Sequence, residues 1–537
     1  MKAQCLPFNQ IPHSTKFFVD FLSWAPSVRR FYSRPPQFTD WMKDEASKLR
    51  YDSARRGQVA SALERQNKSW GASAKTLENI ARLRAGACTA VTGQQVGLFG
   101  GPAFSIYKAL TAVKLAEEAT KNGIDCIPVF WLATQDHDLA EISHVSIPGP
   151  DASLRKLTVP PQGHPDAPVG TIAFGEEIVP VVEAAVGLLG DSEETALLRE
   201  CYRPGETFGS AFAKLFARWF ADQGVILLDA SDPEMNALAV PIYKSAVERA
   251  AELEQALLDR DKELESAGYH QQVKVTTSST LLFVLHDGAR LPIHRSSTKS
   301  DEFVIGREGI SQAELLRQIA SSPQNFSANV LLRPVVQDHL LPTLVYTGGA
   351  AEVAYFAQAA VVYEALLGRI TPIIPRFSAT LVDAKPNSLM ERYGVSLPDL
   401  FQGPEAVRGK LAAHSLPAEL QSAFNQAANS LKTSITQISS SLSRLDKTLV
   451  DAANNAGSKM QYQLDQLWGR AEKAELRQTE VLGRHAELLS NSLYPDKTLQ
   501  ERELAGIYFL SRHGTGFLRD IYSEIRLDCL NHQVISL

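Results

Sequence analysis

Short apolar runs alternate with amphipathic patterns through the middle of the chain. Runs that are short and apolar predict strands at 88–91, 127–133, 225–228, 344–346 and 373–374. Apolar positions spaced three and four apart predict helices at 102–120, 233–256 and 351–367. Strands that alternate with helices in this way are typical of an α/β protein with a parallel sheet.

Two long stretches interrupt the alternation, and we interpret them as insertions at about 145–205 and 260–325. The first is rich in Pro and Gly and predicts loops with short strands. The second contains an apolar run at 280–294 that predicts a strand, followed by a second short run, EFVIG. Ser311 and Glu314 form a capping-box pattern that predicts a helix beginning near 312.

A heptad pattern follows the α/β region. Apolar or small residues recur in steps of four and three at Phe424, Ala428, Leu431, Ile435, Ile438, Leu442, Leu445, Leu449, Ala452 and Ala456. This pattern spans about four and a half heptads and predicts a coiled coil or a long antiparallel helical hairpin. The heptad register shifts next to Gly457. Pairing between chains would make a homodimer and pairing within one chain an arm; we expect the homodimer.

The patterns together divide the chain into four segments. Residues 1–87 are mainly helical and join the core, and 88–400 form the α/β core with its two insertions. Residues 401–490 form the helical coiled-coil arm, and 491–537 are expected to pack back on the core. A chain of 537 residues is longer than one hydrophobic core usually organises, which agrees with several structural regions.

Composition and charge exclude several classes of protein. The chain is 44% hydrophobic and 21% charged, as in ordinary globular proteins, and a net charge of −6 gives no overall basic field for nucleic acid. The sequence contains neither an apolar run of about 18 residues nor the apolar core of a signal peptide, so we expect no membrane span. Five scattered cysteines without a CxxC pair favour a reducing cytoplasm over a disulfide framework.

Four glycines and two glutamines lie between the first predicted strand and its helix: Gly93, Gln94, Gln95, Gly97, Gly100 and Gly101. Glycines before a helix start let a ligand approach the backbone, and free N–H groups there attract a phosphate or carboxylate. The spacing matches neither the dinucleotide G-x-G-x-x-G nor the Walker pattern. A tight turn that only packs helix on strand is the alternative interpretation.

Asp136, His137 and Asp138 follow the second predicted strand. Ligands of open α/β sheets bind outside the carboxyl ends of the strands, so this cluster and the glycine turn should share one edge. The cluster could bind a divalent metal, act as an acid/base pair, or hold an ammonium or hydroxyl group of a substrate. Alternatively, Asp136 or Asp138 caps the following helix. No strong zinc spacing is present, so we expect no structural metal.

Further polar residues fall at the ends of later strands. Gly348 and Gly349 follow the fourth predicted strand, and Arg376 follows the fifth. Asn329 and Arg333 precede the fourth strand in an apolar context, where an arginine is either an anion clamp or part of a structural ion pair. Convergence of these residues on one edge indicates a binding site more strongly than any of them alone.

Several motifs resemble a known family. The segments TGQQVGLFGGPAFSIYKA, PVFWLATQDHDLAEI, SANVLLRPVVQDHLLPTLVYTGGAAEVAYFAQ, IIPRFSATLVD and LQERELAGIYFLSRHG are similar, in order, to the cysteine ligase family of bacillithiol biosynthesis, BshC. The resemblance implies a Rossmann-like core similar to class I aminoacyl-tRNA synthetases, two connecting-peptide insertions, and a C-terminal coiled coil used for dimerisation. It also implies a reaction that joins the carboxyl group of cysteine to the amine of glucosaminyl-malate, giving bacillithiol.

The resemblance leaves the chemistry open. The His-x-Gly-His and Lys-Met-Ser-Lys-Ser signatures of the synthetases are absent, so their contacts to ATP cannot be carried over. We expect ATP or ADP as the cofactor with Mg²⁺ as its counter-ion, His137 as general base, and Asp136 or Asp138 as its orienting group. Arg333 and Arg376 are candidates for the malate carboxylates. Alternatives are a nucleotide-binding scaffold without ligase activity and a metal-dependent hydrolase that uses residues 136–138.

Overall fold

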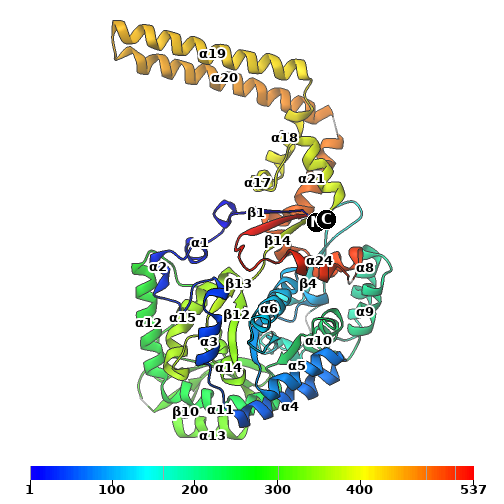
Figure 1. Cartoon of the computed structure of the whole chain (residues 1–537), viewed down its shortest axis with the longest axis vertical. Coiled ribbons are helices and arrows are strands. Elements are labelled where there is room, and N and C mark those ends of the chain that lie inside the picture. The colour runs from blue at the N-terminus through cyan, green and yellow to red at the C-terminus, as the bar shows by residue number, and fades with distance from the viewer. Residues whose placement is uncertain (1, 161–162, 300, 479, 515) are drawn as a thin grey trace.

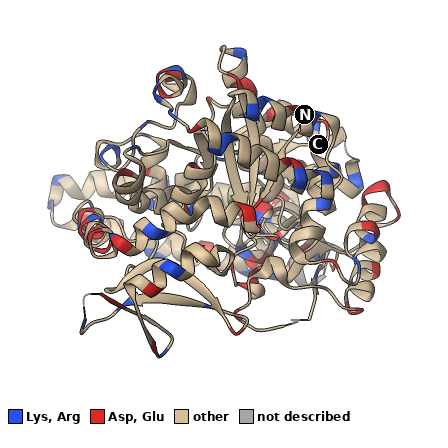
Figure 2. Ribbon diagram, turned by 90° about the horizontal axis from the view of Figure 1, so that it is seen from below, with Lys and Arg blue, Asp and Glu red and all other residues tan. Residues whose placement is uncertain are grey.

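The computed structural model describes residues 2–160, 163–299, 301–478, 480–514 and 516–537. Figure 1 shows a body built around a central sheet, with a long helical arm projecting from it. Both ends of the chain lie together where the arm meets the body. Figure 2 shows basic and acidic residues mixed over the side of the body that faces away from the arm.

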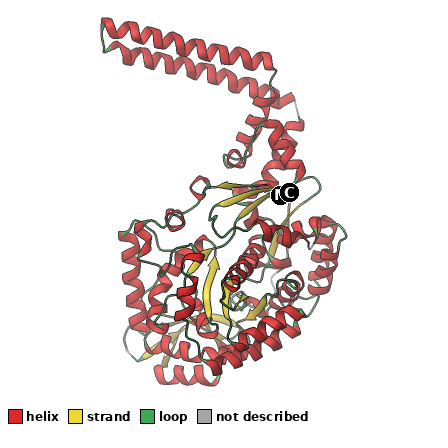
Figure 3. Cartoon of the chain, in the orientation of Figure 1, coloured by secondary structure: helices red, strands yellow, loops and turns green. Residues whose placement is uncertain are grey.

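The five predicted strands are confirmed and form one parallel sheet. They are β2 (Cys88–Gln94), β3 (Cys126–Leu132), β6 (Ile226–Asp229), β12 (Thr343–Gly348) and β13 (Ile373–Pro375). The sheet order is β13-β12-β2-β3-β6, which is the doubly wound Rossmann order, with its switch point between β2 and β12. Figure 3 shows the strands enclosed by helices.

Helices cover both faces of this sheet, which explains why its strands read as continuous apolar runs. Along β3, Val129 and Trp131 pack on one side and Phe130 and Leu132 on the other. The first side is covered by α4 (Ser53–Ser69), α11 (Pro233–Glu248), α12 (Ala250–Ser266), α14 (Arg333–Leu340) and α15 (Ala350–Leu367). The second is covered by α6 (Phe104–Lys121) and α10 (Phe208–Trp219). The helix expected over 233–256 is two helices, α11 and α12.

The first insertion holds more helix than its sequence predicted. After α7 (Leu139–Ile142), a hairpin of β4 (His144–Pro148) and β5 (Leu154–Thr158) agrees with the expected short strands. Two helices then follow, α8 (Ile178–Leu189) and α9 (Glu193–Cys201), where loops were expected. Pro180 lies in the first turn of α8, where a helix tolerates proline, so the proline did not mark a break.

The second insertion is an antiparallel sheet of β7 (Ser279–His286), β8 (Ala289–Arg295), β9 (Glu302–Ile305), β10 (Glu308–Ser311) and β11 (Phe326–Ala328). The single strand expected over 280–294 is a hairpin, because Asp287 and Gly288 both adopt positive φ and turn the chain. Helix α13 (Gln312–Ser321) begins where predicted, and Ser311 accepts a hydrogen bond from the Glu314 N–H. The Glu314 carboxylate pairs with Arg317.

A third sheet brings together distant parts of the chain. β15 (His532–Ser536) lies between β1 (Lys2–Leu6) and β14 (Ala379–Val382). Within the segment expected to form the core up to 400, β14 pairs with the last strand of the chain and not with the central sheet. The final segment, with α22 (Gln500–Glu503), α23 (Gly506–His513) and α24 (Gly516–Glu524), packs on the core around α6.

The arm is a helical hairpin within one chain. Helices α19 (Ala418–Leu445) and α20 (Leu449–Gln478) pack against each other along their length (Figure 1). The single heptad run expected over 424–456 is therefore divided by a turn at 446–448. Helices α16 (Ala384–Tyr393), α17 (Leu397–Leu400), α18 (Pro404–Ser415) and α21 (Glu480–Leu493) connect the hairpin to the body. Gly457 lets Ile435 of the opposite helix approach closely, since an added Cβ would lie 3.0 Å from its side chain.

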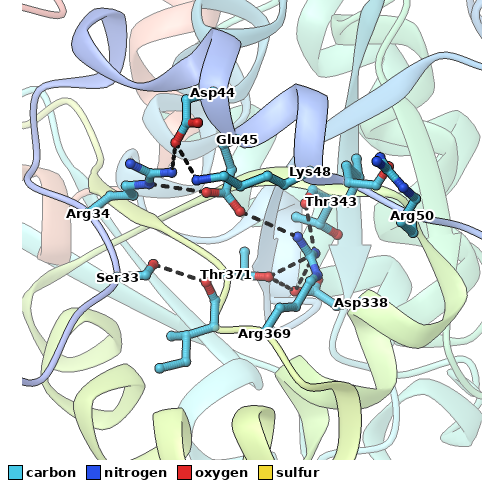
Figure 4. A network of polar contacts seen from close by, with 12 residues as sticks. Ser33, Arg34, Asp44, Glu45, Lys48, Arg50, Asp338, Thr343, Arg369 and Thr371 are labelled. Carbon is cyan, nitrogen blue, oxygen red and sulfur yellow. Dashed lines mark hydrogen bonds and ion pairs between the residues drawn. The ribbon is translucent and has the colours of Figure 1, made fainter.

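The N-terminal segment is helical, as expected, with α1 (Lys16–Leu22), α2 (Pro26–Arg29), α3 (Met42–Lys48), α4 and α5 (Ala74–Ala85). A polar network fastens α3 to the core (Figure 4). Arg34 pairs with Asp44 and Glu45, and Glu45 lies 3.8 Å from Arg369. Arg369 in turn donates to the Thr343 carbonyl and the Thr371 hydroxyl, beside the start of β12.

Helix α15 has the length and hydropathy of a membrane span, but half of it is buried inside the protein against the central sheet. The five cysteines are free thiols. Cys5 of β1 and Cys529, which precedes β15, nevertheless lie with their sulfur atoms 3.0 Å apart.

Candidate functional site

A cavity of about 340 Å³ lies at the switch point of the sheet. Gly93 and Gln94 at the end of β2, Trp131 of β3 and Tyr346 of β12 contribute to its walls. This is where a doubly wound fold binds its ligand, because the crossover connections diverge between the first and fourth strands and leave a crevice.

Two further cavities adjoin the central one. A cavity of about 310 Å³ shares Gly349 and Arg376 with it, and a cavity of about 170 Å³ shares Gln94 and Phe104 with it. Arg502, from the C-terminal segment, lines all three. We call them the central, the N-terminal and the small cavity; together they give room for more than one substrate.

Four cationic side chains line the central cavity: Lys108, Arg333, Arg376 and Arg502. Lys108 is buried in the second turn of α6 and donates hydrogen bonds to the Gly93 carbonyl (2.7 Å) and to Gln94 Oε1 (2.9 Å). Its ammonium lies 2.5 Å from the Glu352 carboxylate. Burial lowers the pKa of Lys108, and the Glu352 charge opposes that shift.

Glu352 connects Lys108 to the start of α15. Its carboxylate accepts hydrogen bonds from the Tyr346 hydroxyl (2.5 Å) and from the Gly349 N–H (2.8 Å). Burial alone would raise the pKa of Glu352, but Lys108 lowers it overall. Gly348 is required at the strand end, because a Cβ there would lie 2.8 Å from the Glu352 side chain.

Arg376 is held by a buried network behind the cavity. Glu501 accepts hydrogen bonds from the Arg376 guanidinium (2.7 Å) and from the Ser378 hydroxyl (2.8 Å). His532 bonds to Ser378 and Thr380 through its two ring nitrogens, and burial lowers the pKa of His532 to about 4. Burial would raise the pKa of Glu501, but Arg376 lowers it. The network therefore joins the C-terminal segment to the site.

Arg333 and Asn329 come from the segment before β12. Arg333 begins α14, donates to Gln337 and Tyr355, and lies over the rings of Trp131 and Tyr346 at 5.8 and 5.6 Å. Asn329 Oδ1 accepts hydrogen bonds from the N–H groups of Leu331 and Leu332 and so stabilises the turn that precedes this helix. Arg333 lines the central cavity, whereas Asn329 has a structural role.

The glycine turn is packed more tightly than a ligand cradle requires. The N–H groups of Gly97, Gly100 and Gly101 donate within the turn, to the carbonyls of Gln95, Gly97 and Leu98. Gly100 has φ of +87°, and a Cβ there would lie 2.6 Å from the Trp219 ring. These contacts give the three glycines a packing role, so their amides are not available to hold an anion.

The two glutamines before this turn face the cavities with fixed amide orientations. Lys108 can only donate, so Gln94 must present its oxygen to Lys108 and keeps its NH₂ group for a ligand. Gln95 donates from Nε2 to the Asp136 carboxylate at 2.7 Å, which leaves its carbonyl oxygen for a ligand. Asp136 therefore orients Gln95.

His137 and Asp138 point to other partners. Arg290 of β8 donates to His137 Nδ1 at 3.0 Å, so a neutral imidazole carries its proton on Nε2 and offers a donor there. Burial lowers the pKa of Arg290 to about 10, and the Asp136 charge opposes that shift. Asp138 is exposed and caps α7 through the Glu141 N–H, which is the alternative predicted from the sequence. Within the described part of the chain, no three His, Cys, Asp or Glu side chains are grouped as metal ligands.

Six of the site residues predicted from the sequence line the central cavity: Gly93, Gln94, Gln95, Arg333, Gly349 and Arg376. Sequence reasoning missed Phe104, Lys108, Glu141, Glu352, Glu501 and Arg502 as site residues. A lysine among apolar residues in FSIYKALTAV was a signal for a buried role of Lys108. Glu501 and Arg502 lie in the family motif LQERELAGIYFLSRHG, but their place at the cavity could not be predicted, because only the third sheet brings their segment there.

Comparisons with known proteins agree with this architecture. The model of the N-terminal Rossmann-like domain of bacillithiol biosynthesis BshC matches residues 1–377, and the model of its C-terminal coiled-coil domain matches 379–537. The division between the two falls between β13 and β14, where the structure leaves the central sheet.

Relatives match over nearly the whole chain, and each carries the provisional name cysteine ligase BshC. A protein of Koribacter versatilis is 47% identical over 100% of both chains. One of Solibacter usitatus is 35% identical over 100% of both, and one of Salinibacter ruber is 30% identical over 97% of this chain and 96% of its own. The Rossmann order of the sheet, the helical arm and these full-length matches show that the chain belongs to the BshC family of bacillithiol biosynthesis.

Proposed function

We propose that this protein is an ATP-dependent ligase that joins the carboxyl group of L-cysteine to the amine of glucosaminyl-malate, forming bacillithiol. The names of its relatives support a cysteine ligase. The observation that carries the proposal is the convergence of three guanidinium groups, those of Arg333, Arg376 and Arg502, on connected cavities at the switch point of the sheet. Malate carboxylates and nucleotide phosphates are the anions that such a site suits.

The residues present fit a bound nucleotide or a dicarboxylate. Gly349, Ala350 and Ala351 line both the central and the N-terminal cavity, so the first turn of the 18-residue helix α15 faces them. The positive end of the α15 helix dipole favours a bound anion there, and Arg376 and Arg502 add two guanidinium groups to the same walls. ATP, when bound, supplies the group that activates the carboxylate for amide formation, with Mg²⁺ as its counter-ion. Arg333 and Arg376 are our candidates for the malate carboxylates.

The experiment is a reconstitution with purified protein, cysteine, glucosaminyl-malate and MgATP, followed by mass spectrometry. We expect a product with the summed mass of the two substrates less one water, which disappears when any component is omitted. The same samples show whether AMP or ADP accumulates, which distinguishes an adenylate from a phosphate as the activated acid. Nucleotide binding without product would contradict the ligase and leave a nucleotide-binding scaffold.

We also propose that the arm pairs two copies of the chain. Met460 and Leu467 lie one heptad apart on α20 and are about half exposed, and Tyr462 is exposed between them. A partner helix would bury these side chains. Light scattering of the wild type should give a dimer mass, and Met460→Glu with Leu467→Glu should give a monomer. A monomeric wild type would contradict the proposal.

A further inference from the structure

The small cavity combines a charged side with an apolar side. On the side that it shares with the central cavity lie Gln94, Gln95, Glu141 and Arg502. Away from this boundary, its walls include the buried apolar side chains of Ile142, Val145 and Ala505, together with the polar residues His144, Ser146 and Glu503. Such a cavity suits a ligand that carries charge at one end and a small group at the other that can lie against apolar side chains.

Two opposite charges on the shared side are not paired. Glu141 and Arg502 are both exposed, and among the residues that the structure describes neither side-chain charge has an ion-pair or side-chain hydrogen-bond partner, so both are open to a ligand. Glu503, which also lines the small cavity, differs because it accepts a hydrogen bond from Ser146 at 2.5 Å. Desolvation of the Arg502 guanidinium and the nearby charge of Arg376 lower the pKa of Arg502, and the charges of Glu501 and Glu141 oppose this shift. A ligand that carries both charges can pair with both groups through charge-assisted hydrogen bonds.

The two glutamines add one donor and one acceptor between these charges. Lys108 fixes Gln94 so that its NH₂ group is free, and Asp136 fixes Gln95 so that its carbonyl oxygen is free. The shared side thus offers a carboxylate and a carbonyl for an ammonium, and a guanidinium and an amide NH₂ for a carboxylate.

We propose that the small cavity is the subsite for the amino acid substrate, which binds as an α-amino acid zwitterion. Its ammonium contacts Glu141 and Gln95, its carboxylate contacts Arg502 and Gln94, and the thiol-bearing side chain lies against Ile142, Val145 and Ala505. The inference rests on the proposed ligase function. It places the carboxylate to be activated at the boundary with the central cavity, where the other anion-binding residues lie.

The subsite also predicts specificity. A volume of about 170 Å³ suits an amino acid with a short side chain. Phenylalanine should not compete with cysteine, because its ring exceeds the space beside Val145 and Ala505. Serine and alanine should compete about tenfold to 100-fold more weakly than cysteine, since one small group in an apolar pocket discriminates only modestly.

The test compares cysteine binding and turnover in the wild type and in Glu141→Gln, with Glu176→Gln as a matched control at an exposed glutamate outside the cavities. Calorimetry should show cysteine affinity weakened about 10-fold to 100-fold by Glu141→Gln, as expected when a charge-assisted hydrogen bond is lost. The KM for cysteine should rise by the same factor, while the KM for glucosaminyl-malate stays within twofold.

Failure of this inference is distinguishable from failure of the ligase function. Product formation with unchanged cysteine affinity in Glu141→Gln would overturn the subsite and leave the ligase. Cysteine binding that Glu141→Gln weakens, without product from the wild type, would support the subsite and overturn the ligase. Absence of cysteine binding to the wild type would overturn the subsite. Arg502→Met, with exposed Arg307→Met as control, should weaken the same affinity and checks the other end of the zwitterion.

Discussion

The central cavity and the Asp136–His137–Asp138 cluster follow neighbouring strands of one sheet, yet their polar groups are used differently. In the cluster, Asp136 binds Gln95, His137 accepts from Arg290, and Asp138 caps α7. Around the cavity, Arg502, Glu141 and the Gln94 NH₂ group keep hydrogen-bonding capacity for a ligand. The Asp136 and Asp138 carboxylates are thus used within the protein, while the free groups around the cavity come from three separate segments of the chain: the end of β2, helix α7 and helix α22.

The largest expected effect is on the cavity side of this comparison. Lys108→Met leaves Glu352 buried without its partner and frees Gln94, so kcat/KM should fall at least about 100-fold and stability by about 3–5 kcal/mol. Steady-state kinetics and thermal unfolding measure the two effects.

A double variant separates folding from function. Lys108→Met with Glu352→Gln removes the unpaired charge, so it should regain stability but not activity. Lys114→Met on the same helix is the matched control, because Lys114 lies outside the three cavities. Near-wild-type turnover in Lys108→Met would show that the cavity is not the site.

The next effect concerns the buried network behind Arg376. His532 has a pKa of about 4 in the folded protein, below its ordinary 6.5, so the unfolded chain binds its proton first as the pH falls. His532 therefore lowers the free energy of unfolding on acidification, with the loss beginning near pH 6.5 and reaching on the order of 3 kcal/mol near pH 4. Denaturant unfolding at pH 7 and pH 5 should show a smaller drop in His532→Gln than in the wild type. An equal drop would contradict this assignment.

A smaller effect is expected at Asp136. Asp136→Ala releases the Gln95 amide, so the KM for cysteine should rise about tenfold while the KM for glucosaminyl-malate stays nearly constant. Asp136→Asn can still accept the hydrogen bond and should stay within about threefold of the wild type. A fall in kcat without a change in either KM would instead indicate that Asp136 acts in the chemical step.

The smallest effect is expected at His137. His137→Gln keeps a donor near the position of Nε2, so kcat/KM should stay within about tenfold of the wild type. A general base at this position would lose about 10²-fold to 10⁴-fold in His137→Gln and in His137→Ala alike. Parallel kinetics of the two variants decide between these roles, and an equal large loss would return His137 to the catalytic machinery.

Local patterns in the sequence predicted the sheet well and the site in part. The central strands are apolar runs with polar or glycine residues at or just after their carboxyl ends, so Gln94, Gly349 and Arg376 could be assigned to one edge. Arg502 and Glu501 could not, because they reach the cavity only through pairing of β14 with β15, across about 150 residues that include the arm. The turn at 446–448 could not be located from the sequence, because the heptad spacing of apolar residues continues through it.

The most direct test of the account is a crystal structure of the protein soaked with MgATP and cysteine. The account predicts ligand density between Gln94, Arg376 and Arg502, with cysteine in the small cavity next to Glu141. Density held by His137 and Asp138, with none in the three cavities, would contradict it.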